Sequence, residues 1–201
     1  MTASTAEPGL RERKKAATRQ ALHEAAVRLA IEHGPDHVTV ETIADAAGVS
    51  RRTFSNYFAN KEEALLHSDQ QRVRALIEMV RARPSGESPW TALTGAADEF
   101  YGALGDLDPG AVAQGRLVRT HPSLVAAQVQ TYAALERDLA AAVAARLPEE
   151  GQDPVRVRLM AAVFLTALRV SLGLWLDQAP GIPLSGLVSR ALAEAGRGFG
   201  G

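Results

Sequence analysis

The chain has 201 residues, with 22 Lys and Arg against 23 Asp and Glu, and it contains no cysteine. Its length allows one compact domain or two small ones, its near-zero net charge excludes a generic polycation, and the lack of cysteine excludes disulfide bonds and thiolate metal sites. Ala, Leu, Val and Arg dominate, aromatic residues make up 5%, and alternating apolar patterns are scarce, which favours an all-α fold.

Basic residues are concentrated near the N-terminus. Residues 1–61 hold nine Lys and Arg against seven Asp and Glu, whereas the rest of the chain holds 13 against 16. Such a cluster is typical of a surface that faces phosphate groups, although a solvated helix end has the same composition. Within Leu10–Gln20 the basic residues are Arg11, Arg13, Lys14, Lys15 and Arg19, against the single acidic Glu12.

The first 60 residues predict three helices. Apolar spacing predicts a helix over 10–33, which the Gly34-Pro35 pair ends because glycine permits a left-handed turn and proline cannot continue a helix. Thr39 is the predicted N-cap of a second helix, and Gly48 ends it. Ser50 caps a third helix only two residues later, a gap too short for anything but a tight corner.

The third predicted helix has two different faces. Phe54 and Phe58 are four residues apart, so they share one face, which we expect to be buried. The guanidinium groups of Arg51 and Arg52 could bridge O6 and N7 of guanine. Alternatively, they could only neutralise phosphate. A capped helix with these two faces suits insertion into the DNA major groove. The donor-rich side chains fall on the opposite face: Arg51, Arg52, Ser55 and Asn56.

At these positions the chain resembles the TetR family of bacterial transcriptional regulators. The resemblance is strong over residues 11–65, and it implies that Thr39, Tyr57 and Lys61 hold phosphate. The matching elements are Thr39-Val40, Ile43-Ala44, Ala46-Ala47-Gly48-Val49-Ser50, Thr53-Phe54, Tyr57-Phe58 and Lys61-Glu62. The predicted DNA-binding residues are Thr39, Ser50, Arg51, Arg52, Thr53, Ser55, Asn56, Tyr57 and Lys61.

A fourth helix is predicted over 60–83. Asn60 with Glu63 three residues later has the pattern of a capping box. The segment 84–89, PSGESP, is the clearest break in the chain. We therefore predict a helix-turn-helix DNA-binding domain over 10–60, a continuous helical connector over 60–83, and a ligand-binding and dimerisation domain over 84–201.

Five further helices are predicted, which gives about nine in all. They are expected at about 89–104, 110–119, 122–147, 153–178 and 183–196. The helix over 153–178 is apolar on more than one face, which is unsuited to a monomer surface. By resemblance to the family, we expect a homodimer that packs through helices 153–178 and 183–196. A helix wholly internal to one subunit is the alternative.

The resemblance also implies a pocket for a small-molecule effector in the C-terminal domain. Arg116, Arg119 and Arg169 are informative, because an arginine on an otherwise apolar helix needs an acidic partner or an anionic effector. Each aromatic or aliphatic member of the set, taken alone, fits a packed core better than a ligand contact. The predicted ligand-binding residues are Trp90, Phe100, Tyr101, Leu104, Arg116, Leu117, Arg119, Gln128, Tyr132, Met160, Phe164, Leu168 and Trp175.

We expect no catalytic site, metal site or cofactor. His33 and His37 have a metal-like spacing, but the Gly-Pro pair between them breaks the common helical face. The glycine-rich end, 196–201, resembles a dinucleotide loop with no helix after it. The N-terminus lacks a signal peptide, and Arg169 interrupts the most apolar segment, so we expect a cytoplasmic protein without a membrane partner.

The sequence thus predicts a ligand-responsive DNA-binding regulator. Its simplest form is a homodimeric repressor that binds a palindromic operator in double-stranded DNA and is released by an unknown small molecule. The alternative is a small-molecule-binding or carrier protein whose DNA-binding unit is vestigial. A helical hydrolase or dehydratase would need a polar constellation in the C-terminal half, and the sequence offers none there.

Overall fold

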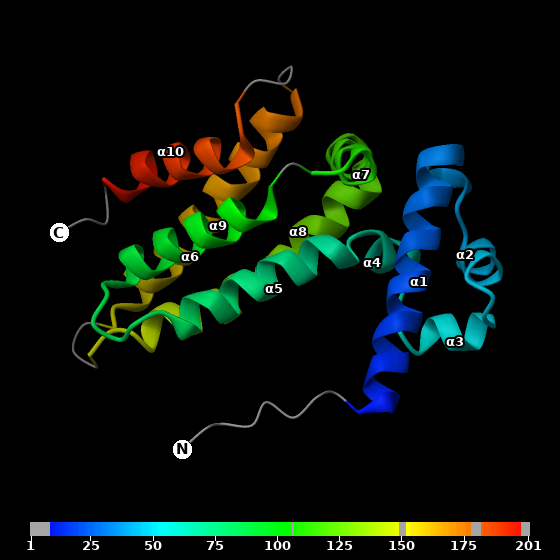
Figure 1. The fold of residues 1–201 in the computed structure, drawn as a ribbon, viewed down its shortest axis with the longest axis horizontal. Helices are drawn as coiled ribbons and strands as arrows, with labels where there is room; N and C mark the ends of the chain where they lie inside the picture. Colours follow the sequence, from blue (N-terminus) through cyan, green and yellow to red (C-terminus); the bar gives the residue numbers. More distant parts are fainter. Residues whose placement is uncertain (1–8, 106, 149–151, 178–181, 198–201) are drawn as a thin grey trace. The chain divides into compact units, whose positions relative to one another are not determined.

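The computed structural model describes residues 9–105, 107–148, 152–177 and 182–197. Within these ranges the secondary structure consists of ten α-helices and one 3-10 turn (Figure 1), which confirms the all-α prediction. The tail beyond residue 197 lies outside them. The chain forms two compact units, residues 1–68 and 69–201, and each is described by itself.

The first unit contains α1 (Leu10–His33), the 3-10 turn η1 (Pro35–His37), α2 (Val40–Ala46), α3 (Arg51–Ser55) and α4 (Lys61–Leu65). Its core includes Leu22, Ile43 and Phe54, all of which are buried. In Figure 1, α2 and α3 lie on one side of the long α1.

Local hydrogen bonds fix the helix-turn-helix. Thr39 Oγ1 accepts a hydrogen bond from Thr42 N at 3.1 Å, and Thr42 Oγ1 accepts one from Thr39 N at 3.0 Å, so α2 begins with a reciprocal capping box. Gly48 then adopts φ +68°, a left-handed conformation that glycine reaches without steric cost. Ser50 Oγ caps α3 by accepting from Thr53 N at 3.1 Å. These are the start and stop signals that the sequence predicts.

The prediction of a continuous helix over 60–83 is wrong. It is divided at Leu66 into α4 and α5 (His67–Ala82), which raises the number of α-helices from about nine to ten. Ala64, Leu65, Leu66 and His67 are all buried, and four consecutive side chains cannot share one face of a straight helix. We attribute the break to this run of buried residues, because neither proline nor glycine occurs there.

Lys61 has a structural role within the first unit. Its ammonium group donates hydrogen bonds to the backbone carbonyls of Pro35, at 2.8 Å, and Val38, at 3.0 Å. These bonds tie the start of α4 to the segment that leads into α2. Two of the three N–H donors of the ammonium group are therefore already used in the free protein.

The second unit contains α5, α6 (Pro89–Leu104), α7 (Pro109–Thr120), α8 (Pro122–Ala144), α9 (Pro154–Asp177) and α10 (Leu184–Gly196). Four of these helices begin with proline at their first position, where its missing N–H costs nothing. Helix α9 packs against both α8 and α10, and α10 also packs against α6 (Figure 1). The bounds agree with the predicted helices to within about three residues.

Helix α9 is long and apolar enough to cross a membrane by length and composition alone, but a core helix passes the same test. One side of it, which includes Met160, Phe164 and Leu168, is buried in the core of the unit. The other side carries exposed Val155, Leu159, Val170 and Leu174, whose relative exposures range from 42% to 73%. The two apolar faces predicted for this helix are therefore both present, and only one is covered.

We predict that Lys61→Met lowers the free energy of unfolding of the DNA-binding unit. The substitution removes a charged donor from two carbonyl groups, which typically costs about 1–3 kcal/mol. Urea unfolding followed by circular dichroism measures the change. Lys15→Met, at an exposed position of α1, is the matched control and should change the stability by less than about 0.5 kcal/mol. Equal effects of the two substitutions would contradict the structural role.

Candidate functional site

The two faces predicted for the third helix are both present, although Asn56 and Phe58 lie just after the end of α3. Phe54 and Phe58 are buried, with ring centroids 5.8 Å apart. On the outer side, Arg51, Arg52 and Asn56 are exposed to solvent. The burial of the aromatic pair therefore turns hydrogen-bond donors outward, where a base edge could be reached.

The two arginines of α3 differ in their surroundings. Arg51 Nη1 lies 3.0 Å from Glu41 Oε1 of α2, in an ion pair between two exposed side chains. Among the described residues, Arg52 has no such partner. Arg51 must leave Glu41 to reach a base or a phosphate, whereas Arg52 is available without rearrangement.

Several predicted DNA-binding hydroxyl groups take part in the caps. Ser50 Oγ and Thr53 Oγ1 lie 2.9 Å apart, and Ser55 Oγ donates to the carbonyl of Arg51 at 3.2 Å. Both the backbone N–H and the hydroxyl of Thr39 face Thr42. In the free protein these groups shape the turn rather than point a free donor outward.

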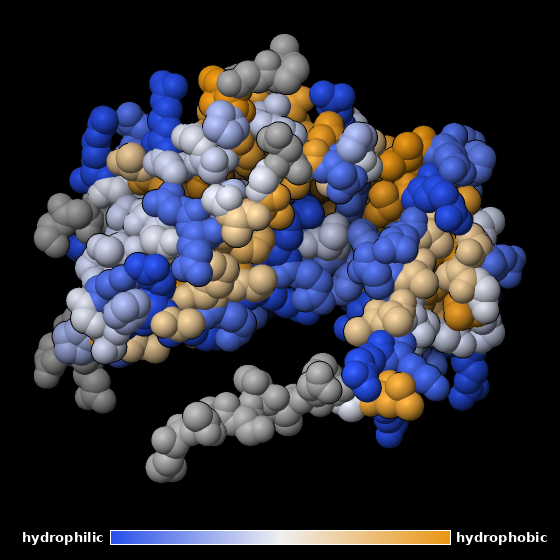
Figure 2. All heavy atoms as spheres, viewed as in Figure 1, coloured by the Kyte–Doolittle hydropathy of each residue, from blue (hydrophilic) through white to orange (hydrophobic). Residues whose placement is uncertain are grey.

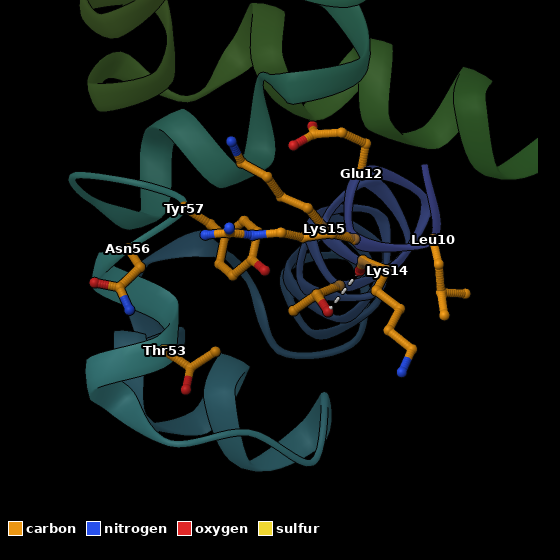
Figure 3. A pocket seen from close by; sticks show the side chains of 9 residues that line it. Leu10, Glu12, Lys14, Lys15, Thr53, Asn56 and Tyr57 are labelled. Carbon is orange, nitrogen blue, oxygen red and sulfur yellow. Dashed lines mark hydrogen bonds between the residues drawn. The ribbon is translucent and has the colours of Figure 1, made fainter. Parts of the chain in front are cut away.

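An open groove of about 780 Å³ joins α3 to the start of α1. Figure 3 shows Thr53, Asn56 and Tyr57 around one part of it and Leu10, Lys14 and Lys15 around another. Hydrophilic side chains gather at this end of α1 (Figure 2). The predicted base-reading helix and the N-terminal basic cluster therefore form one surface. The sequence suggested a phosphate-facing role for the cluster without placing it beside α3.

Arg19 packs against the rings of Tyr57 and Phe58. The guanidinium carbon of Arg19 lies 5.8 Å from the ring centroids of both Tyr57 and Phe58, within the range of a cation–π contact. Arg19 is half-buried, and its Nε is a buried donor without a partner among the described residues. It therefore holds the turn that follows α3, unlike the exposed lysines at the start of α1.

The second unit contains a small cavity of about 50 Å³ to which five helices contribute. Five of the 13 predicted ligand-binding residues line it: Tyr101, Arg119, Gln128, Tyr132 and Leu168. Eight lining residues are not in the predicted set: Asp69, Arg72, Val73, Gly115, Val118, Leu165, Arg169 and Leu172. Asp69, Arg72 and Val73 belong to α5, which the predicted boundary at residue 84 excluded. Arg169 interrupts an apolar segment of the sequence and lies outside the predicted set.

The other eight predicted residues do not line this cavity. Phe164 is fully buried and packs edge-on against Trp90, with centroids 6.5 Å apart. Arg116 donates to the carbonyl of Leu176 at 3.3 and 3.4 Å. The eight are Trp90, Phe100, Leu104, Arg116, Leu117, Met160, Phe164 and Trp175. Packing in the core accounts for Trp90, Met160 and Phe164, as the alternative from the sequence allowed.

Arg119 already has an acidic partner. Its guanidinium group donates to Asp177 at 2.9 and 3.0 Å and to the carbonyl of Gly173 at 2.7 Å. A Cβ at Gly173 would lie 3.3 Å from the guanidinium carbon, so glycine gives Arg119 room to approach α9. The hydrogen bond from Arg119 lowers the pKa of the Asp177 carboxyl group below its ordinary value.

Polar groups occupy the α5 side of the cavity. Asp69 forms an ion pair with Arg72 and accepts a hydrogen bond from Gln128 Nε2 at 3.2 Å. Burial raises the pKa of Tyr101 to about 12 and also raises that of Tyr132, so both phenols are protonated at neutral pH. In the described ranges no group of three or more His, Asp or Glu side chains could hold a metal ion.

Comparisons with known proteins match both units. Residues 22–67 match the family model "Bacterial regulatory proteins, tetR family", and residues 87–200 match the model "MftR C-terminal domain". The chain is 38% identical over 169 residues to the HTH-type transcriptional regulator TcmR of Streptomyces glaucescens, covering 81% of this chain and 75% of that protein.

Solved structures share the fold at lower identity. FadR of Thermus thermophilus, a transcriptional repressor in complex with lauroyl-CoA, is 23% identical with a TM-score of 0.57, covering 88% of this chain and 92% of that one. SmeT of Stenotrophomonas maltophilia in complex with triclosan is 18% identical with a TM-score of 0.61, covering 90% and 91%.

We predict that substitutions in α3 and at the start of α1 weaken DNA binding in different ways. Arg52→Ala should cost about 1–3 kcal/mol on a preferred sequence and relax the preference, as expected for a base contact. The double change Lys14→Gln, Lys15→Gln should weaken binding to all duplexes alike and reduce the log–log salt slope by about 0.9 per lost phosphate contact. Fluorescence anisotropy across a salt series distinguishes the two.

The control for both variants is Arg28→Ala, an exposed α1 position that lies outside the groove. A loss of affinity from Arg52→Ala that is the same for every duplex sequence would mean that Arg52 contacts only phosphate.

Proposed function

The chain belongs to the TetR family of bacterial regulatory proteins, and on this premise we propose that it is a repressor whose homodimer occupies a palindromic operator until a small-molecule effector releases it. Family membership confirms the function class that the sequence predicts, a ligand-responsive transcriptional regulator. The members of this family are regulators and not enzymes. The DNA-binding role falls to residues 10–60, and effector binding and dimerisation fall mainly to residues 84–201.

The observation that carries the DNA-binding proposal is the continuous surface formed by α3 and the start of α1. Placed in the major groove, α3 directs Arg52 and Asn56 toward base edges. Lys14 and Lys15 line the groove of the protein that joins α3 to the start of α1, and they would contact the adjacent phosphates of the DNA. Phosphate contacts fix the register of the helix, and base contacts supply the preference for a sequence.

Dimerisation is supported by the uncovered side of α9. The exposed residues Val155, Leu159, Val170 and Leu174 lie within a stretch of 20 residues of α9, and the first and last are about 28 Å apart along the helix. An apolar stripe of this length is expected to be covered in a soluble protein. Around a two-fold axis the stripe would pack against its own copy. Exposed Gly186 and Ala193 leave α10 with small side chains that permit a close approach.

A two-fold dimer would present two copies of α3, so its operator would be an inverted repeat. Helix α9 is then an interface helix of a soluble regulator rather than a membrane span, and we assign the protein to the cytoplasm, where its DNA target lies.

The effector would act through the cavity of the second unit. The relatives FadR and SmeT were solved with lauroyl-CoA and triclosan, and we extend the capacity for a small-molecule effector to this chain. The first turn of α5 is held to α8 by hydrogen bonds from Gln128 to Asp69, at 3.2 Å, and from Gln70 to Thr131, at 3.5 Å. An effector that disturbs these bonds would move the start of α5, which follows α4 after one residue.

Selection of random DNA duplexes on the purified protein tests the proposed function. We expect enrichment of an inverted repeat whose half-sites are separated by about one helical turn or a multiple of it. A carrier protein with a vestigial DNA-binding unit would enrich no sequence, and Arg52→Ala would then have no measurable effect on DNA binding.

We predict that the double change Leu159→Glu, Val170→Glu converts the dimer to monomers of 21.3 kDa. Loss of central apolar contacts typically costs about 2 kcal/mol or more, roughly 30-fold in the dissociation constant. Light scattering after size exclusion measures the mass, and binding to the selected operator should weaken in parallel. Val129→Glu on α8, equally apolar and exposed, is the control. A dimer that survives the double change would place the interface elsewhere.

A further inference from the structure

The cavity of the second unit has an excess of positive charge. Among its lining residues, Arg72, Arg119 and Arg169 stand against the single carboxylate of Asp69. Arg119 and Arg169 are both exposed at the edge of the cavity, so solvent and nearby carboxylates can balance their charges. What balances each arginine therefore indicates what the cavity can bind.

Two of the three arginines are already paired. Arg72 is bound to Asp69, and Arg119 is bound to Asp177 outside the lining set. Arg169 of α9 lines the same cavity, is exposed, and has no carboxylate within 4.0 Å among the described residues. It is the one lining arginine that can accept an anion without first losing a protein partner.

Two phenols line the same cavity as this arginine. Tyr101 and Tyr132 both line the cavity, and both are protonated at neutral pH, as described above. A protonated phenol can donate to an anionic oxygen. Neither hydroxyl group makes a hydrogen bond to another described residue, so both donors are open to a ligand.

The remainder of the lining is apolar. Val73, Val118, Leu165, Leu168 and Leu172 come from three helices, and all but Leu172 are buried. They would surround a hydrocarbon or aromatic body. At about 50 Å³ the cavity is far smaller than the roughly 300–1,000 Å³ of typical ligand sites. The structure therefore represents a closed form, and binding must separate the helices that line the cavity.

We propose that this cavity binds a small organic anion with a single negative charge and an aromatic or aliphatic body. The anionic oxygen would pair with Arg169 and accept hydrogen bonds from Tyr101 and Tyr132, while the body lies against the leucines of α9. This inference rests on the proposed effector role of the cavity, and it adds the chemical class of the ligand. Asp69, the one carboxylate in the lining, would oppose the anion and so weaken its binding.

Two fluorescent probes with the same ring system test the proposal on the full-length dimer. 1-Anilinonaphthalene-8-sulfonate carries one negative charge, and N-phenyl-1-naphthylamine is its neutral counterpart. We expect Arg169→Gln to raise the dissociation constant of the sulfonate at least tenfold and that of the neutral probe less than twofold. Asp69→Asn should tighten binding of the sulfonate alone, because it removes the opposing charge.

Tyr132→Phe separates the cavity from other apolar surfaces. Tyr132 lies on α8, away from the exposed stripe of α9 on which either probe could also bind. Removing its hydroxyl group should weaken sulfonate binding several-fold and leave the neutral probe unchanged. Arg158→Gln is the matched control for Arg169→Gln. Arg158 also lies on α9, pairs with Glu136 at 3.6 Å and does not line the cavity. This substitution should change the dissociation constant of neither probe.

The proposal is overturned if the sulfonate fails to bind, or if Arg169→Gln changes its affinity no more than Arg158→Gln does. It is also overturned if the two probes bind equally well and respond alike to every variant. These results do not depend on DNA. Failure of the duplex selection with an intact Arg169 effect would reject the repressor, whereas a selected operator with no Arg169 effect would reject only the anionic ligand.

Discussion

The burial of Phe54 and Phe58 is the contact on which the DNA-reading surface depends. Helix α3 has only five residues, and an isolated helix of that length is unstable in water. Its position comes instead from Phe54 in the core and from Phe58, whose ring packs edge-on against His67 at a centroid distance of 5.3 Å. The direction in which Arg52 and Asn56 point is therefore set by aromatic packing on the opposite side of the helix.

Helix α9 contributes both to the cavity and to the exposed apolar stripe. Its buried side supplies Leu165 and Leu168 to the cavity, while its uncovered side carries the stripe proposed to meet a second subunit. A straight helix transmits a shift on one side to the other, because its backbone hydrogen bonds resist deformation. A ligand that displaces α9 from the core would thus alter the geometry of the dimer as well as that of the cavity.

The helix-turn-helix could be predicted because its determinants are local. Thr39, Gly48 and Ser50 act within three residues of their own positions, and those start and stop signals can be recognised in any sequence. Lys61 shows the limit of prediction from local signals. Its ammonium group binds carbonyl groups of Pro35 and Val38, which lie 26 and 23 residues earlier, and no local pattern announces such a contact. The resemblance to the family assigned this residue to phosphate, whereas in the free protein it supports the fold.

Fewer of the cavity residues could be predicted, because part of the lining lies before the strongest break in the chain. The segment 84–89 ends α5 and separates it from α6, since proline and glycine interrupt helices wherever they occur. Yet Asp69 and Arg72, fifteen and twelve residues before Pro84, form one wall of the cavity. The helix predicted as a connector therefore also lines the cavity. A ligand in this cavity, as proposed above, would contact α5 directly, because the ion pair between Asp69 and Arg72 lies in the lining itself.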